Sequence, residues 1–400
     1  MNILLFIRDS SNHNSLNYFT EEIAQQLKKH GDNIYYLSLT DSDKIAEDLV
    51  KILTSHNIEA AIMFNAFGQQ DYLCNGDKNL WDVFDIQFFN YIVDHPIEHD
   101  IDLDSKCKNY HVICIDKKHK SFIENNYPGI KSVHFLPIAG SGDLSIPKDD
   151  YSMFNSRKQG IVLTAGLMDP DFILEQVNAF PQDIRRLALS IIEYMKDHLD
   201  KSPEEALDDV LISQYSGAIK ENREYYLQII HIMSFAPFYI RTWIRKKIVD
   251  SLIKSGVKLH IYGDGWDSLI AKYPNNNAVL YGDIDISQTP ALYRDTQLAL
   301  NIMPMFKAGS HDRIATAQIN GAAVITDENG YLCDFYEGTD GIFYYSLNDI
   351  DTLPEKLSAI LSDERMLYET AINGQNIARQ MLNWNELCEK LYEILRSQIR

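Results

Sequence analysis

The stretch QLALNIMPMFKAGSHDRIATAQINGAAVITD, residues 297–327, decides the fold of the second half of the chain. It begins with a short apolar strand, continues through a turn that ends at Gly309, and then predicts a helix of about ten residues. Ser310 is expected as the N-cap of this helix, and Gly321 ends it before a second buried strand over 322–326. The stretch therefore predicts a strand, a helix and a second strand in succession.

Two positive side chains flank the expected start of this helix, Lys307 just before it and Arg313 in its first turn. A helix N-terminus presents unpaired N–H groups and a partial positive charge, so two added cations make a good seat for a phosphate or diphosphate. We therefore interpret the segment as an anion pocket. The alternative is that Ser310 only caps the helix and that both cations are solvated.

The composition limits the classes of function. Four hundred residues, of which 45% are apolar, are enough for two domains and an insertion. The chain has 37 Lys and Arg against 57 Asp and Glu, and its net charge of −20 opposes nucleic acid and anionic lipid as partners. The five cysteines show no metal-binding spacing, and no segment has the length of a signal peptide or membrane span. A cytoplasmic protein with reduced thiols is expected.

The first half of the chain alternates strands and helices. The loop after its first strand contains no glycine, which argues against a dinucleotide-binding turn and hence against an NAD enzyme. Alternation of this kind predicts a parallel sheet covered by helices on both faces, with ligands beyond the carboxyl ends of the strands. The expected strands cover 3–7, 33–39, 59–65, 87–93, 110–115 and 131–136, and the expected helices cover 16–29, 42–56 and 117–126.

The strongest polar cluster of the first half is Asp94-His95-Pro96, which directly follows the strand over 87–93, with Glu98 and His99 just behind it. A histidine beside a carboxylate at a strand end suits a general base or a group that orients a sugar hydroxyl. The alternative is that both side chains form local hydrogen bonds that fix the turn before the proline. Asp9 and His13, in the first loop, are weaker candidates for the same cleft.

A polar linker over 139–160 leads into a second α/β domain, whose first strand is expected over 160–164. Between this strand and the next one, over 258–262, the periodicity is helical and predicts an insertion over 168–254. The insertion is a candidate acceptor surface or homodimer contact. Its expected helices are 172–180, 182–198, 203–215, 222–235 and 237–255; strands over 278–281 and 341–345 and helices over 289–295, 352–361, 363–380 and 384–398 complete the chain.

The strand over 258–262 runs into Gly263-Asp264-Gly265-Trp266. The two glycines permit close approach of the backbone to a ligand. Trp266 brings a flat apolar surface. These residues are therefore candidates for a binding site.

Three motifs resemble one known family. They are Pro304-x-Phe306-x-x-Gly309-x-His311-x-Arg313 followed by Gly321 and Val-Ile-Thr-Asp at 324–327, Gly-x-Gly-Trp at 263–266, and Asp-His-Pro at 94–96. Together they resemble the CgeB-like glycosyltransferases, of the spore-maturation type, which are similar to the large retaining group of GT-B enzymes. The resemblance covers 255–400 well, is thinner over 85–165 and is absent over 167–250.

The resemblance implies a GT-B fold, an α/β architecture in which two doubly wound Rossmann-like domains face each other across a cleft. Residues 1–150 would form the acceptor-side domain. Residues 151–380 would form the donor-nucleotide domain and carry the insertion. Residues 381–400 would form a helix that packs back on the first domain.

The resemblance also implies roles for individual donor-site residues. Gly166 would lie close to the donor phosphates, main-chain groups after Tyr281 would contact the nucleotide base, and the helix start at Asn329-Gly330 would bind the sugar or diphosphate. The chain departs from the GT-B pattern where Ala308 and Thr316 replace the acids expected there. This departure concerns recognition of the donor ribose.

The resulting hypothesis is a metal-independent glycosyltransferase of the hexosyltransferase type. It would move a sugar from a nucleotide-sugar, with a UDP-sugar favoured, to a protein, cell-surface or glycan acceptor. No cofactor or metal is expected, because no Asp-x-Asp has the strand-then-loop setting of a metal site. Asp94, His95 and His311 are assigned catalytic roles, with His311 orienting the sugar. The residues assigned to the donor are Gly166, Gly263, Gly265, Trp266, Tyr281, Asn301, Lys307, Gly309, Ser310, Arg313, Thr316, Asn329 and Gly330.

Two alternatives stay open. The first is a catalytically inactive binding module of GT-B shape, which the missing acids at positions 308 and 316 favour. The second is another α/β enzyme acting on sugar phosphates, such as an epimerase or phosphotransferase, but it predicts a Walker-type loop or a dinucleotide turn that the chain lacks. Inversion at the anomeric carbon would need a base such as Asp94 or His95, whereas retention would not, and the residues do not decide between them.

Overall fold

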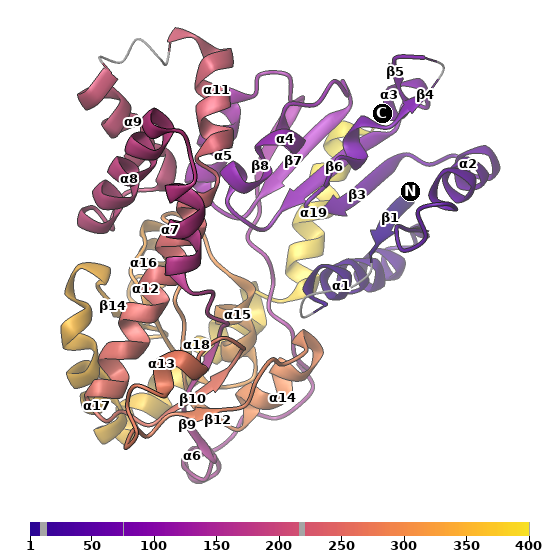
Figure 1. Ribbon diagram of the computed structural model, residues 1–400. Coiled ribbons are helices and arrows are strands. Elements are labelled where there is room, and N and C mark those ends of the chain that lie inside the picture. Colours follow the sequence, from indigo (N-terminus) through magenta and orange to yellow (C-terminus); the bar gives the residue numbers. More distant parts are fainter. Residues whose placement is uncertain (9–13, 75, 216–220, 400) are drawn as a thin grey trace. The chain divides into compact units, whose positions relative to one another are not determined.

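The structure is a computed structural model that describes residues 1–8, 14–74, 76–215 and 221–399 (Figure 1). The chain divides into two compact units. Unit 1 comprises Met1–Ile138, Asp285–Ser287 and Trp384–Arg400, and unit 2 comprises Ala139–Ile284 and Gln288–Asn383.

Unit 1 is built on a six-stranded sheet in the order β2-β1-β3-β6-β7-β8, in which all neighbouring strands are parallel. Every residue of β3, β6 and β7 is buried, as the near-continuous apolar runs of these strands require when both faces of a sheet are covered. The bounds are β1 Asn2–Ile7, β2 Asn33–Ser38, β3 Ala60–Phe64, β6 Gln87–Ile92, β7 Tyr110–Cys114 and β8 Ser132–Phe135.

Helices flank this sheet, and the last helix of the chain is among them. α19 packs against α1, where the rings of Phe19 and Trp384 lie 5.6 Å apart between their centroids. The helices are α1 Ser15–Lys29, α2 Ile45–Ser55, α3 Leu80–Val83, α4 Asp100–Leu103, α5 Lys117–Asn126 and α19 Trp384–Gln398, with short 3-10 turns η1 Gln69–Asp71 and η2 Pro96–His99. A two-stranded hairpin of β4 Leu73–Cys74 and β5 Lys78–Asn79, which the sequence did not predict, precedes α3.

Unit 2 contains a second sheet of six parallel strands, in the order β11-β10-β9-β12-β13-β14. The chain builds outward from β9 in one direction and then returns to build outward from β9 in the other, so the order reverses between β9 and β12. The bounds are β9 Gln159–Thr164, β10 Leu259–Tyr262, β11 Val279–Leu280, β12 Thr296–Leu300, β13 Ala323–Asp327 and β14 Phe343–Tyr345. The predicted class of two doubly wound α/β sheets is therefore confirmed.

Helices occupy the chain between β9 and β10, where the insertion was predicted. α12 packs against α7 and α8, and α8 packs against α9. Figure 1 shows α7, α8 and α9 gathered in one part of unit 2. Their bounds are α7 Pro170–Asn178, α8 Gln182–Asp197, α9 Pro203–Tyr215, α11 Arg223–Ile232 and α12 Phe235–Lys254.

The remaining helices of unit 2 connect or cover its strands. They are α6 Tyr151–Asn155, α13 Asp267–Ile270, α14 Thr289–Arg294, α15 Asp312–Ile319, α16 Gly330–Phe335, α17 Leu353–Ser362 and α18 Glu364–Met381, with the 3-10 segment η4 Leu347–Thr352. The 3-10 segment η3, Ile286–Gln288, has its first two residues in unit 1. Among the described residues, no helix combines the length and the apolar character that crossing a bilayer requires.

Candidate functional site

Helix α15 begins one residue later than the sequence predicted. His311 is the residue at its N-cap, with an extended backbone (φ −104°, ψ 150°) and no side-chain cap, and Asp312 opens the helix. The prediction of Ser310 as N-cap is wrong, because the chain stays extended through His311 and the Ser310 hydroxyl lies 3.5 Å from the carbonyl oxygen of His311 instead. The helix has eight residues rather than about ten.

The guanidinium of Arg313 reaches from this helix to the carboxyl end of β9. Its Nη1 donates to the carbonyl oxygen of Thr164 at 2.6 Å. A second arginine, Arg245 of α12, donates from its Nη1 to the carbonyl oxygen of Gly166 at 3.1 Å. In the described part of the chain, the Nε atoms of both arginines are buried without a hydrogen-bond partner. Two guanidinium groups thus meet beyond the end of β9.

The two arginines repel each other. Burial, followed by the charges of Arg313 and Arg241, lowers the pKa of Arg245. Within the described residues neither Arg313 nor Arg245 has an acidic partner within ion-pair distance. Arg157 of the same unit is different, since it pairs with Asp149 at 2.8 Å. Open α/β sheets bind ligands at the place where the order of the strands reverses. The positive charges of Arg245 and Arg313 lie at this place, so it suits the binding of an anion.

Other polar groups surround the arginine pair. The hydroxyl of Tyr293 lies 2.7 Å from Oγ1 of Thr164, and burial raises the pKa of Tyr293 to about 12. Asp312 is buried beside the imidazole of His311. Burial alone would raise the pKa of Asp312, but the charges of His311 and Arg313 outweigh it and lower that pKa. Asp312 is therefore held as a carboxylate next to His311.

Lys307 does not join this pair, contrary to our expectation. Its ammonium donates to the carbonyl oxygen of Leu199, in the insertion between α8 and α9. The loop that follows is tied to the start of α16, because Asn329 Nδ2 donates to the carbonyl oxygen of Gly309 at 3.1 Å and the Gly330 N–H donates to that of Lys307 at 3.1 Å. The Gly330 N–H, which was expected to meet the ligand, is thus already used within the protein.

The two glycines after β10 serve backbone packing. A Cβ on Gly263 would lie 2.4 Å from the carbonyl carbon of Ala165, and one on Gly265 would lie 1.9 Å from the carbonyl oxygen of Leu167. Trp266 is completely buried and donates from Nε1 to the carbonyl oxygen of Ala165 at 2.7 Å. The expectation that Trp266 offers a flat surface to a ligand is therefore wrong, because this loop packs on the segment that contains Gly166.

Three further predicted residues have protein partners. Tyr281 is 47% exposed and its ring stacks on that of Tyr262, with centroids 4.4 Å apart. Asn301 is buried, and its Nδ2 donates to Oγ1 of Thr326 at 2.9 Å. The hydroxyl of Thr316, also buried, accepts a hydrogen bond from the Ser141 N–H at 3.1 Å. Thr316 therefore fastens the segment after residue 138 to α15, which corrects its assignment to the donor.

In unit 1, the carboxylate of Asp94 and the imidazole of His99 lie beyond the carboxyl end of β6. Asp94 Oδ2 accepts a hydrogen bond from Asn65 Nδ2 at 2.9 Å and lies 3.7 Å from Nε2 of His99. The other nitrogen of His99, Nδ1, lies 3.4 Å from Oδ2 of Asp102. Burial would lower the pKa of His99, but hydrogen bonding to Asp102 and Asp94 outweighs it and raises this pKa to about 9.

His95 occupies a different environment from the one predicted. It is 1% exposed, its Nδ1 accepts from the Ile97 N–H at 3.3 Å, and its ring packs edge-on against His119. The histidine beside Asp94 is thus His99. The buried ring of His95 does not fit the catalytic role predicted for it, and its hydrogen bond with Ile97 agrees with the alternative that His95 fixes the turn. Asp9 and His13 lie outside the described residues.

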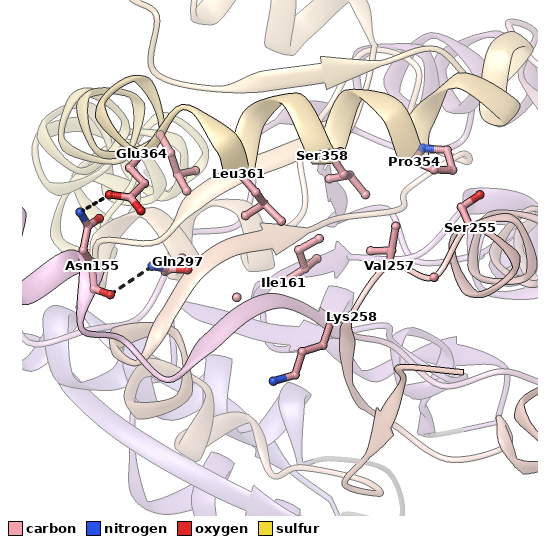
Figure 2. A pocket seen from close by; sticks show the side chains of 14 residues that line it. Asn155, Ile161, Ser255, Val257, Lys258, Gln297, Pro354, Ser358, Leu361 and Glu364 are labelled. Carbon is pink, nitrogen blue, oxygen red and sulfur yellow. Dashed lines mark hydrogen bonds between the residues drawn. The ribbon is translucent and has the colours of Figure 1, made fainter. Parts of the chain in front are cut away.

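Unit 2 also has a pocket of ≈ 420 Å³ at the opposite edge of its sheet (Figure 2). Its walls include Ile161 near the start of β9, Val257 before β10, and α17. Figure 2 shows Ser358 and Leu361 projecting from that helix toward Ile161. The pocket thus lies at the amino end of β9, and neither Arg245 nor Arg313 lines it.

A family model described as glycosyl transferase-like matches residues 241–392. This range contains Arg245, Arg313 and all of α15. The match supports a glycosyltransferase. It names glycosyltransferases at large and does not single out the CgeB-like group. A search of curated proteins finds no match.

Solved structures with the same fold align with almost the whole chain. Sucrose-phosphate synthase from Thermosynechococcus elongatus aligns with a TM-score of 0.57 at 11% identity, over 99% of this chain and 98% of that one. HepE from Anabaena, in complex with UDP and glucose, aligns at 0.54 and 12%, over 99% and 100%. An alpha-glucosyltransferase in complex with UDP-glucose and DNA containing an abasic site aligns at 0.54 and 11%, over 99% of each chain. These likenesses establish the GT-B type of fold.

Proposed function

We propose that the protein transfers a sugar from a nucleotide-sugar donor to a protein, cell-surface or glycan acceptor, without a metal ion or other cofactor, as a glycosyltransferase of the CgeB-like group. A UDP-sugar is the favoured donor, since HepE and the alpha-glucosyltransferase are both known in complexes with UDP or UDP-glucose. The family match supports the reaction class. The donor would bind to unit 2.

The observation that carries this proposal is the pair formed by Arg245 and Arg313. Each donates one hydrogen bond to a main-chain carbonyl at the carboxyl end of β9 and has a buried Nε without a partner in the described chain. Arginine presents planar donors that match phosphate oxygens, and a diphosphate would neutralise both charges at once. We therefore place the diphosphate of the donor between these two guanidinium groups.

This placement would serve catalysis as well as binding. When the bond between the anomeric carbon and the diphosphate breaks, negative charge grows on the leaving phosphate. Cations fixed before the reaction stabilise such charge without reorganising, which is the role that a divalent metal has in other enzymes. His311, whose side chain is 30% exposed and lies beside the carboxylate of Asp312, would orient the sugar.

The test is the affinity for UDP, measured by calorimetry. Arg313→Ala and Arg245→Ala should each weaken binding by about 10–100-fold, the value of one hydrogen bond to a charged group. Lys247→Ala is the matched control, because Lys247 is an exposed cation on the same helix as Arg245, and it should bind UDP like the wild type. Unchanged affinity in both arginine variants would contradict the site.

An inactive binding module is the second candidate, and one observation favours it. Thr316, which stands where the GT-B pattern has an acid, is engaged with Ser141 and is buried. The two functions differ in turnover. An enzyme should release UDP from at least one of UDP-glucose, UDP-galactose and UDP-N-acetylglucosamine, whereas a module should bind UDP and release none.

A further inference from the structure

The order of the strands in unit 1 reverses between β1 and β3, and polar side chains meet at that edge of the sheet. They come from three connections. Arg8 follows β1, Asn65 follows β3, and Asp94 follows β6. Asp102 on α4 completes the group by holding the His99 imidazole from the side opposite Asp94.

The arrangement is fixed by hydrogen bonds from the main chain and from Asn65. The Gly68 N–H donates to Asp102 Oδ1 at 2.7 Å, so Asp102 is held while its other oxygen contacts His99. Asn65 binds Asp94 Oδ2 through Nδ2 and accepts from the Val93 N–H through Oδ1 at 3.2 Å. The carboxylate of Asp94 is therefore held in place from the end of β3.

An aromatic ring lies beside these groups. Phe67 is 45% exposed and meets His99 edge-on, with centroids 5.6 Å apart. The guanidinium of Arg8 lies over the Phe67 ring, 3.7 Å from its centroid. Ligand sites commonly combine an aromatic surface with a few fixed polar groups. The side chain of Asp94 is 42% exposed, so solvent and ligands reach it.

We propose that Asp94 accepts a hydrogen bond from a sugar hydroxyl at this edge of unit 1, and that His99 is the positioning residue that fixes the Asp94 carboxylate for it. The proposal rests on the proposed function, which supplies the sugar. The hydroxyl is that of the acceptor sugar, because residues 1–150 are the part of the chain that we expect to bind the acceptor.

The protonation of His99 explains why Asp94, rather than His99, accepts the hydrogen bond from the sugar hydroxyl. With its pKa near 9, the imidazole is a cation at neutral pH and has no lone pair with which to accept a proton or a hydrogen bond. Asp94 Oδ2 lies 3.7 Å from this cation, and an ionised carboxylate accepts hydrogen bonds only. A hydroxyl donor is the partner that this carboxylate fits.

The experiment compares ligands that contain a sugar with one that does not. Affinities for UDP, for UDP-glucose, and for glucose in the presence of saturating UDP are measured by calorimetry and saturation-transfer NMR. Asp94→Ala and His99→Gln should leave the UDP affinity within about twofold. They should weaken the affinity for glucose by about tenfold or more, because a charged hydrogen bond is lost. A weakened affinity for UDP-glucose with an unchanged affinity for glucose would contradict the assignment of the hydroxyl to the acceptor.

Two further variants keep the positioning role testable. His99→Lys retains a positive charge and should recover part of the affinity that His99→Gln loses. Asp104→Asn, at an exposed acid next to α4, should match the wild type. If Asp94→Ala binds both sugar probes like the wild type, the proposal fails, and equal affinities of His99→Gln and wild type would remove His99 from it. Failure of the wild type to bind UDP would instead contradict the proposed function.

Discussion

The guanidinium groups of Arg245 and Arg313 repel each other, so an anion bound between them would relieve an unfavourable interaction that the folded chain otherwise keeps. Arg157 shows the contrasting case, because an acid and the carbonyl oxygens of Thr296 and Gly321 satisfy it. Folding free energy is small, and uncompensated like charges persist only where other contacts hold them. A diphosphate should therefore stabilise unit 2 as well as bind to it.

Gly265 offers a test of backbone packing near the donor site. Its φ is +89°, and an added Cβ would lie 1.9 Å from the carbonyl oxygen of Leu167, so Gly265→Ala should lower the free energy of unfolding by about 2 kcal/mol or more. Gly160→Ala is the control, because no atom lies within 4 Å of the added Cβ. Denaturant unfolding measures both, and equal stabilities would contradict the packing role of Gly265.

His99 and Arg245 are two residues of the candidate sites to which the sequence alone assigned no role. Asp94 and its neighbouring histidines were found because they follow a strand directly, but the ring of His95 is buried and the 3-10 turn η2 places His99 beside Asp94. Arg245 carries no local signal at all. It sits in a long helix with an apolar and aromatic sequence, and only the fold of unit 2 brings it to the residues after β9.

Helix α15 was predicted from the sequence, but its first residue was not. Its existence, its ending at Gly321 and the strands on either side follow from the apolar periodicity, whereas its first residue depends on tertiary contacts. Ser310 is a favoured N-cap residue, yet the chain remains extended through His311. By contrast α5 and α9 have the predicted bounds, 117–126 and 203–215. The hairpin of β4 and β5 was missed because two-residue strands leave no period to detect.

Thr316→Val tests the hydrogen bond by which α15 holds the segment around Ser141, at the start of unit 2. The change removes the acceptor for the buried Ser141 N–H, so the free energy of unfolding should fall by about 1–3 kcal/mol while the UDP affinity stays unchanged. Thr316→Ser keeps the hydroxyl and should behave like the wild type. A loss of UDP affinity at unchanged stability would return Thr316 to the donor site.

Removal of divalent metal ions with a chelator tests whether the protein's own cations are enough to bind the anionic donor. The chain has a net charge of −20, and yet the proposed donor is an anion, so its binding depends on cations gathered at one place. If Arg245 and Arg313 supply them, an excess of EDTA should leave both UDP affinity and UDP release unchanged. A strict requirement for a divalent metal would contradict metal independence.

A dimer contact through the insertion remains a prediction, which light scattering can check.

Because α19 belongs to unit 1 but is encoded after unit 2, a ribosome finishes the first sheet long before its last covering helix emerges. Residues 139–383 separate the two, which at ordinary rates of synthesis is a delay of roughly 12–50 s. Throughout that interval Phe19 has no contact with Trp384, and the apolar surface of α1 around Phe19 stays exposed to solvent. The nascent protein is then most exposed to misassembly, and chaperones should associate with it at that stage.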